Sequence, residues 1–232
     1  AGGSGKTTLA VGTAASCAMA GMKTFYLNLE KIDSTALSLG RTAGNMSDVL
    51  LALKASGSDA GVKVMASRGQ EPNTGFHYVS SADSILEYTE LSGEEIIKLV
   101  EDITGLDEYD VLILDFASEF NREKVEILDK CNRIYVPVTE NENSINKMQL
   151  FLHENTLHRE YSGLMKKMVI ISNKTNSMGA GTILQGSGIL NQIPMTAAIP
   201  ANQAMRSIKN MLASAASIRN SFPSIVNEIR GL

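Results

Sequence analysis

The first residues of the chain have the types and spacing of a loop that binds phosphate. The run ends in Gly-Lys-Thr and consists of Gly2, Gly3, Ser4, Gly5, Lys6, Thr7 and Thr8. Glycines let successive backbone N–H groups turn toward one anion, and the N-terminal end of the following helix adds positive charge. In this pattern the lysine reaches the β and γ phosphates and the next hydroxyl binds Mg²⁺. We therefore expect Lys6 to contact phosphate and Thr7 to ligate magnesium; the alternative is a glycine-rich turn before an apolar helix.

Acidic residues close two strand-like segments that could place them beside such a loop. Asp115 follows the apolar residues 111–114, and Glu30 follows the strand-like residues 24–29. Open α/β sheets bind their ligands at the carboxyl ends of the strands. We expect Asp115 to hold the water shell of the magnesium ion, and Glu30 to orient an attacking water molecule or to bind the ion through one. The alternatives are a helix N-cap for Asp115 and a solvated strand end for Glu30.

A third strand-like segment, residues 169–172, leads into the amide side chain of Asn173. An amide can both donate to and accept from the edge of an adenine base. We expect Asn173 to read the base, with a turn-forming role as the alternative. The expected ligands are therefore ATP and Mg²⁺.

The elements that must position these residues alternate along the chain. Strand-length apolar runs occupy residues 24–29, 76–79, 111–114, 134–138, 168–171 and 196–199. Helical spacing covers residues 9–22, 93–105 and 143–158, and the second of these follows an S-x-x-E capping box at Ser92. This alternation predicts an α/β, doubly wound, mostly parallel sheet with helices on both faces. The segment 57–73, rich in Ser, Gly and Ala, is expected to be a mobile surface insert.

Length and composition favour one globular domain over residues 1–232. Apolar residues make up 44% of the chain and charged residues 20%, while the formal net charge is −4. This acidic balance gives no overall attraction for polyanions, and two distant cysteines indicate neither a disulfide framework nor a metal site. The architecture needs a strand before the phosphate loop, so we expect the first central strand to lie upstream of Ala1, in a longer protein that carries a further domain.

In this order, the loop, the acidic strand ends and Asn173 resemble the MinD/ParA family of P-loop ATPases over nearly the whole chain. Within that family the overall sequence pattern is most similar to the TadZ/CpaE group, whose members act in pilus and secretion assembly and carry a receiver-like domain before the ATPase domain. The resemblance implies a cytoplasmic homodimer with ATP at its interface, placed at a pole or near a membrane by pilus or secretion assembly proteins. It puts Asn28 and Glu30 in the D-x-D strand end, Asp115 in the Walker B place and Pro200 beside the adenine.

One position departs from the family pattern. The signature lysine that reaches the partner's phosphates belongs where Ala1 stands. Its absence removes a charge that would stabilise the transition state. We therefore expect ATP binding with slow or absent hydrolysis, in which Glu30 and Lys6 are the catalytic candidates.

Two other functions fit the same family resemblance. A ParA-like DNA partition ATPase needs a basic stripe, and the C-terminal basic residues are few and spread: Arg206, Lys209, Arg219 and Arg230. A MinD-like switch at the division site needs an amphipathic membrane helix, and an apolar stripe does run through Ile218, Phe222, Ile225, Ile229 and Leu232. Because few basic residues accompany that stripe, we favour a packed terminal helix over peripheral membrane contact.

Overall fold

The structure, a computed structural model, describes residues 3–55, 59–117, 121–157, 162–175 and 193–232. The strands in these residues are β1 Thr24–Asn28, β2 Gly69–Gln70, β3 His77–Tyr78, β4 Val111–Asp115, β5 Ile134–Thr139, β6 Met168–Thr175 and β7 Met195–Pro200. The longer helices are α1 Lys6–Met19, α3 Met46–Lys54, α4 Ala60–Ser67, α6 Gly93–Thr104, α7 Arg122–Lys130, α8 Glu142–Leu157, α12 Ala215–Ser221 and α13 Pro223–Arg230. The shorter ones are α2 Ala36–Leu39, α5 Ile85–Thr89, α9 Ser162–Lys167, the 3₁₀ helix η3 Gln203–Arg206 and α11 Ile208–Leu212.

The described strands form two sheets. One has the order β2-β3-β1-β4 and the other β5-β6-β7. Every pairing is parallel except that of β2 with β3. The expected α/β fold is confirmed, and the strands begin and end within a few residues of the sequence-based bounds. The break between β4 and β5 was not expected.

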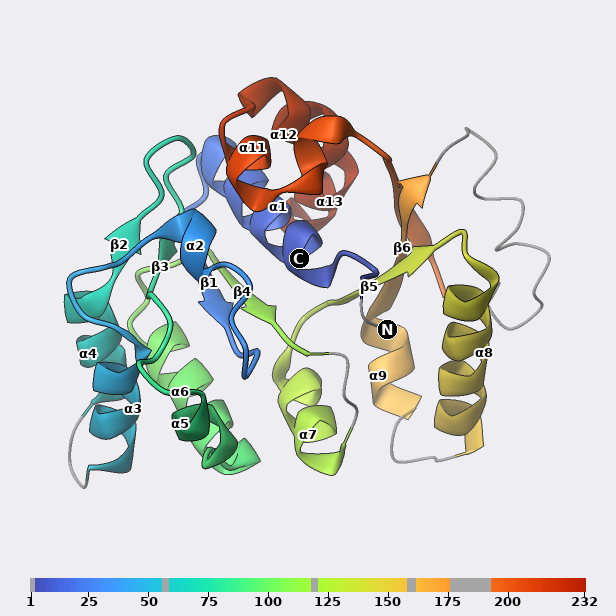
Figure 1. The fold of residues 1–232 in the computed structure, drawn as a ribbon. Coiled ribbons are helices and arrows are strands. Elements are labelled where there is room, and N and C mark those ends of the chain that lie inside the picture. The colour runs from blue at the N-terminus through green and yellow to red at the C-terminus, as the bar shows by residue number, and fades with distance from the viewer. Residues whose placement is uncertain (1–2, 56–58, 118–120, 158–161, 176–192) are drawn as a thin grey trace.

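Helices cover both faces of the sheets (Figure 1). Helix α1 and the C-terminal helices α11, α12 and α13 lie on one face, where a single core cluster includes residues from β1, β6 and β7. On the other face, α3 to α6 pack against β1 and β4, while α7 to α9 pack against β5 and β6. The core is therefore continuous on the α1 face and divided on the other.

The C-terminal apolar stripe belongs to the core of the α1 face. Ile218, Phe222 and Ile225 have no exposed surface. A Cβ atom on Gly12 of α1 would lie only 2.2 Å from Cζ of Phe222, so glycine at this position lets the two helices approach closely. The favoured interpretation, a packed terminal helix, is confirmed for these three residues. None of the helices in the described ranges is long and apolar enough to span a membrane.

Local sequence signals explain several element boundaries. The predicted capping box forms at Ser92, whose hydroxyl accepts from the Glu95 amide while the Glu95 carboxylate accepts from the Ser92 amide. The expected mobile insert at 57–73 is wrong for the residues that the structure describes. Helix α4 lies there, capped by Asp59, and its Val64 is fully buried in the core.

Candidate phosphate-binding site

The glycine-rich segment forms a turn at the N-terminal end of α1. Gly3 and Gly5 both have left-handed backbone angles, with φ of 80° and 88°, which L-residues with side chains rarely adopt. Gly5 is the N-cap of α1, no side chain caps that end, and its first turn holds no acidic residue. The free N–H groups and the helix dipole are therefore available to an anion. Gly2 lies outside the described residues.

Asn173, near the carboxyl end of β6, connects this turn to the second sheet. Its Nδ2 atom donates to the carbonyl oxygen of Ser4 at 2.8 Å, and its Oδ1 atom accepts from the Lys174 amide at 3.0 Å. A Cβ atom on Gly5 would lie 2.4 Å from that same Nδ2 atom. The contact requires glycine at position 5 for space as well as for its backbone angle.

Lys174 is a site residue that the sequence-based reasoning missed. Its Nζ atom donates to the Gly3 carbonyl at 2.7 Å, and its backbone is left-handed with φ of 58°. The register between β6 and β7 shifts at this point. A left-handed non-glycine residue costs free energy and often marks a functional position. The signal available in the sequence was the pair Asn173-Lys174, but nothing there indicated the backbone turn that directs the lysine to the loop.

The two acidic strand ends lie beside the start of α1. Asn28 and Asp115 are register partners on β1 and β4, so the segment after β1 starts next to the end of β4. The Thr7 hydroxyl donates to Oε2 of Glu30 at 3.3 Å. The structure therefore brings Thr7, Glu30 and Asp115 to one sheet edge, as expected for Glu30 and Asp115 from their positions after strand-like segments.

Asn28 and Tyr26 support the acidic residues. The Glu30 amide donates to Oδ1 of Asn28 at 2.8 Å, so the side chain in the first place of the strand-end motif fixes the turn that presents Glu30. The Tyr26 hydroxyl donates to Oδ2 of Asp115 at 2.9 Å. Tyr26 was not singled out from the sequence, because alternation along a buried strand does not reveal which hydroxyl meets a carboxylate.

Asp115 is the carboxyl group whose ionisation the structure alters most clearly. Its pKa is raised to about 6, chiefly by burial and also by the Glu30 carboxylate, although the hydrogen bonds from Tyr26 and Thr7 and the charge of Lys6 act in the opposite direction. The side chain is 3% exposed. Because a nearby cation favours the charged form of a carboxyl group, a bound divalent ion would stabilise the Asp115 carboxylate.

The residues at this edge suit magnesium bound together with phosphate. Mg²⁺ prefers oxygen ligands, keeps several waters and usually binds through one or two carboxylates and substrate phosphates. The Thr7 hydroxyl, the buried Asp115 carboxylate and the nearby Glu30 provide such oxygens. Among the described residues, no three His, Cys, Asp or Glu side chains form a site that would hold a metal by themselves. Phosphate oxygens would have to complete the coordination.

The residues expected beside the base lie at the carboxyl ends of neighbouring strands. Asn173 pairs with Ile199, and Pro200 at the end of β7 is exposed and pairs with Thr175. An amide has two donor hydrogens and two acceptor positions. The bonds of Asn173 to Ser4 and Lys174 use one of each. Asn173 therefore retains one donor hydrogen and one acceptor position that could bond the edge of a base.

Comparisons with known proteins identify the fold. No family model and no curated protein matches the chain. The structure of a ParA family ATPase from Chlorobium tepidum is 15% identical, with a TM-score of 0.73 over 99% of this chain and 93% of that one. MinD from Aquifex aeolicus, in its complex with MinC, is 16% identical, with a TM-score of 0.72 over 100% and 93%.

A third similar structure is that of MinD from Pyrococcus horikoshii in complex with Mg-ADP. It is 14% identical, with a TM-score of 0.62 over 99% of this chain and 92% of that one. At such low identity these similarities concern the path of the backbone. They show that this chain has the α/β fold of the ParA and MinD ATPases.

The raised pKa of Asp115 predicts a specific pH dependence of stability. Between the ordinary carboxyl pKa near 3.8 and about 6, the native state binds more protons than the unfolded state, so the free energy of unfolding falls as pH rises. The shift corresponds to at most about 3 kcal/mol. Asp115→Asn should remove this fall, whereas Glu126→Gln, at an exposed position of α7, should keep it. Urea unfolding without nucleotide or Mg²⁺ at pH 4.5 and 6.5 measures the difference, and parallel profiles for the wild type and Asp115→Asn would contradict the assignment.

Proposed function

We propose that this chain is an ATP-dependent switch that binds ATP and Mg²⁺ at the turn before α1. The observation that carries the proposal is the meeting of three features at one sheet edge. These are the left-handed glycine turn at an uncapped helix end, the Thr7–Glu30 contact, and the buried carboxylate of Asp115. In this proposal, Lys6 and the loop amides bind the phosphates, Thr7 and Asp115 hold the magnesium, and Glu30 positions water.

The adenine occupies the exposed side of the carboxyl ends of β6 and β7. Asn173 supplies its remaining donor and acceptor there, and Pro200 provides an apolar surface. Because the amide also holds Ser4, base recognition is linked mechanically to the shape of the phosphate loop. This link favours a nucleotide whose base and phosphates are both bound.

The switch acts as a homodimer with nucleotide at the interface, and hydrolysis is slow. The dimer is supported by the fold shared with ParA and MinD ATPases and by the exposure of Gly3 in the phosphate loop. Slow turnover is expected because Ala1 stands where the MinD/ParA family, which the sequence resembles, has its signature lysine. In the absence of that charge, the γ phosphate loses one source of transition-state stabilisation.

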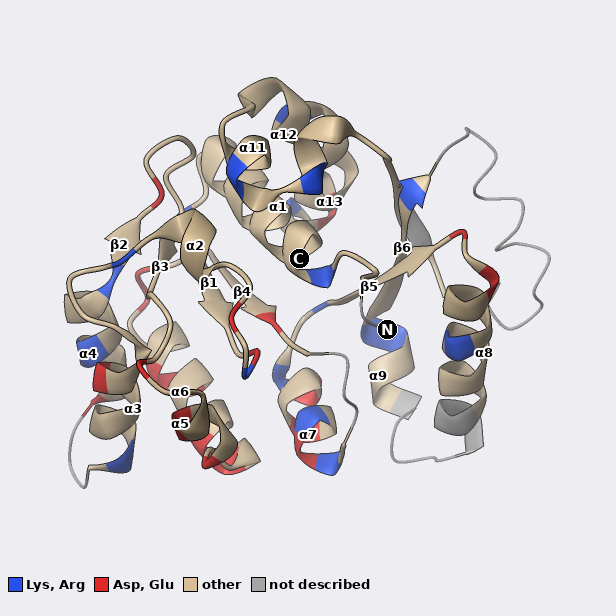
Figure 2. Ribbon diagram, viewed as in Figure 1, with Lys and Arg blue, Asp and Glu red and all other residues tan. Residues whose placement is uncertain are grey.

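For the biological role we propose the organisation of a pilus or secretion assembly at a pole or membrane through partner proteins, as in the TadZ/CpaE group. The support for this role is the resemblance of the chain's degenerate motifs to those of that group, together with observations that disfavour the DNA-partition and membrane-switch alternatives. Basic residues on the C-terminal helices are scattered among other residues along the ribbon (Figure 2), and Arg230 donates to the Ala20 carbonyl, which disfavours a DNA-binding stripe. The buried C-terminal apolar face disfavours a membrane helix.

The phosphate-binding role of Lys6 predicts a loss of ATP affinity on its removal. Lys6→Ala should weaken Mg-ATP binding by roughly 10- to 100-fold, since a hydrogen bond to a charged group is worth about 1.5–3 kcal/mol. Lys209→Ala, at an exposed position of α11, is the matched control and should bind normally. Isothermal titration calorimetry measures both affinities. Equal affinity of Lys6→Ala and the control would refute the assignment of the site.

Nucleotide-dependent association is the second expected property. Mg-ATP should convert the chain from monomer to dimer, because the sandwiched phosphates would contact both subunits. ADP should leave the chain monomeric, and Lys6→Ala should stay monomeric even with ATP. Sedimentation velocity gives the molar mass in each state. A mass that does not depend on the nucleotide would count against the switch.

The charge missing at Ala1 predicts a gain of activity. A cation supplied to the transferred phosphate in trans can be worth roughly 10³ to 10⁵ in turnover. Ala1→Lys should therefore increase steady-state phosphate release, whereas the neutral Ala1→Met should leave it low. Fast hydrolysis by the unmodified chain alone would show that another residue performs this task.

A further inference from the structure

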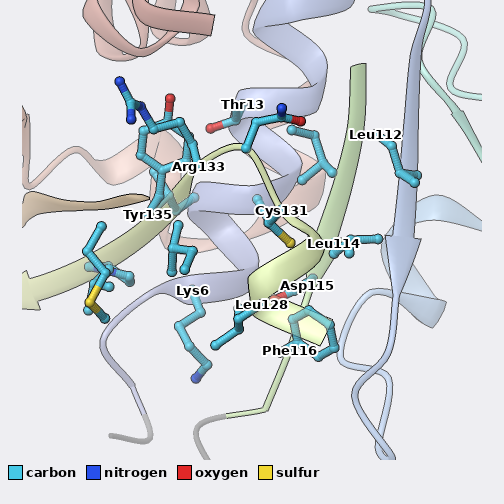
Figure 3. Close-up of a pocket in the computed structure, with 18 of the residues that line it drawn as sticks. Lys6, Thr13, Leu112, Leu114, Asp115, Phe116, Leu128, Cys131, Arg133 and Tyr135 are labelled. Carbon is cyan, nitrogen blue, oxygen red and sulfur yellow. The ribbon is translucent and has the colours of Figure 1, made fainter. Parts of the chain in front are cut away.

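Glu30 can act at the phosphate loop only if the segment that carries it is held there. The Thr7 hydroxyl donates to its carboxylate, and Figure 3 shows the side chains of Lys6 and Asp115 near each other at this end of α1. Misplacing a group that orients a reactant by about 1 Å can cost roughly 10²-fold in rate. The position of the Glu30 backbone therefore needs a structural cause.

Side-chain packing supplies little of this cause between Leu29 and Thr35. These residues form neither a helix nor a strand, and Ile32 in their middle is 72% exposed. The short helix α2 that follows has no buried residue, and its Leu37 is 99% exposed. Hydrogen bonds must therefore hold the segment in place.

The carboxylate of Asp33 collects these hydrogen bonds. Its Oδ1 atom accepts from the amide and the hydroxyl of Thr35, each at 2.6 Å, and from Nδ2 of Asn28 at 2.5 Å. Its Oδ2 atom accepts from the hydroxyl of Ser81. The four donors match the roughly four lone-pair positions of a carboxylate.

Only part of this arrangement is a local turn. An Asp that accepts from the amide two residues on forms an ordinary turn, and the bonds from Thr35 are of this kind. The other two bonds reach further, because Asn28 ends β1 and Ser81 follows β3, which pairs in parallel with β1. Asp33 thus joins the segments that leave two neighbouring strands at the same edge.

Asn28 transmits this restraint to Glu30. While its Nδ2 atom donates to Asp33, its Oδ1 atom accepts from the Glu30 amide at 2.8 Å. The Asn28 side chain is buried, and its two bonds fix which way the amide group faces. A chain of hydrogen bonds therefore runs from Ser81 through Asp33 and Asn28 to the backbone of Glu30. It restrains that backbone but not the Glu30 carboxylate.

We propose that Asp33 is the positioning residue of Glu30. It holds the Glu30 backbone beside the phosphate loop through Asn28 and anchors it to the segment after β3 through Ser81. When magnesium takes the Thr7 hydroxyl, the Glu30 carboxylate is released to water while its backbone stays in place. The consequence for catalysis rests on the proposed function of Glu30, whereas the restraint of the backbone does not.

Two substitutions of Asp33 separate the local turn from the longer connection. The shorter side chain of Asp33→Ser can still form the turn with Thr35, but it falls short of Asn28 and Ser81. Asp33→Asn keeps an acceptor in the place of Oδ1, and its amide nitrogen can donate to the Ser81 hydroxyl. The matched control is Asp83→Ser, because the exposed Asp83 also accepts from an asparagine, Asn45, at 2.8 Å.

Amide hydrogen exchange without nucleotide tests the restraint itself. The Glu30 amide should exchange roughly tenfold or more faster in Asp33→Ser than in the wild type, since a lost hydrogen bond lowers the free energy of local opening. Asp33→Asn and Asp83→Ser should stay close to the wild type. The amide of Leu27, inside β1, reports any general loss of stability. An acceleration at Glu30 no greater than that at Leu27 would overturn the proposal.

Single-turnover phosphate release at saturating Mg-ATP tests the consequence for catalysis. Asp33→Ser should lower the rate constant by roughly tenfold or more, as Glu30→Gln should, and both should leave the dissociation constant of Mg-ATP unchanged. Asp33→Ser combined with Glu30→Gln should be no slower than Glu30→Gln alone, because residues that act through one group are not additive. Asp33→Asn should restore the rate.

The remaining outcomes separate this proposal from the proposed function. Equal acceleration of Glu30 exchange in Asp33→Ser and Asp33→Asn would overturn the proposal, because the charge rather than the hydrogen-bond geometry would then matter. A rate lowered by Glu30→Gln but not by Asp33→Ser would overturn its catalytic consequence. A wild type that binds no Mg-ATP, or a rate that Glu30→Gln leaves unchanged, would instead refute the proposed role of Glu30. The exchange result decides whether Asp33 holds the Glu30 backbone in every one of these cases.

Discussion

The burial of α1 against both sheets is the constraint on which the rest of the structure depends. Leu9, Val11, Ala14 and Ala15 are almost entirely buried, and they share one core with residues of β1, β6 and β7. Among the core clusters of the described residues, this one alone is continuous across the break between the sheets. It fixes the N-terminal end of α1, and with it the glycine turn, at the carboxyl edge of the sheets, where Asp115 ends β4 and Asn173 lies near the end of β6.

At that edge the protein keeps charges in positions that are unfavourable without a ligand. Asp115 is buried, so its pKa is raised, and Glu30 lies close enough to raise it further. The only compensation from side chains in the described structure comes from Tyr26, Thr7 and the charge of Lys6. A cation beside Thr7 would lower the free-energy cost of burying the Asp115 carboxylate. An anion at the uncapped end of α1 would be stabilised by the free N–H groups and the helix dipole. A magnesium ion with bound phosphate satisfies both conditions at once.

The sequence predicted the fold and the meeting of Glu30 and Asp115 at one sheet edge because both depend on local patterns. The apolar runs before Asp115 and Asn173 predict that both residues lie at the carboxyl ends of strands. Since the carboxyl ends of neighbouring parallel strands share one edge, the two residues are predicted to lie at the same edge. The capping box at Ser92 likewise needs only four residues. Lys174 and Tyr26 could not be found in this way, because their roles depend on a left-handed backbone and on a contact across 89 positions of the chain.

The prediction of a mobile surface insert at residues 57–73 was wrong for a related reason. Small residues between 57 and 73 read as a loop, but Val64 is buried against α3 and α6 as part of α4. Gly61 lies where a Cβ atom would be 2.5 Å from the Asp102 carbonyl of α6. Small residues therefore mark close packing of helices here, and tertiary contact outweighs weak local preference.

The most direct test of the account is a crystal structure of the chain with Mg²⁺ and a non-hydrolysable ATP analogue. The account predicts the β and γ phosphates inside the turn of Gly3 and Gly5, the Thr7 hydroxyl bonded to the metal ion, and the Asp115 carboxylate bonded to one of its waters. The Thr7–Glu30 hydrogen bond would then be broken. A nucleotide bound elsewhere, or a turn that holds no phosphate while Thr7 still donates to Glu30, would contradict it.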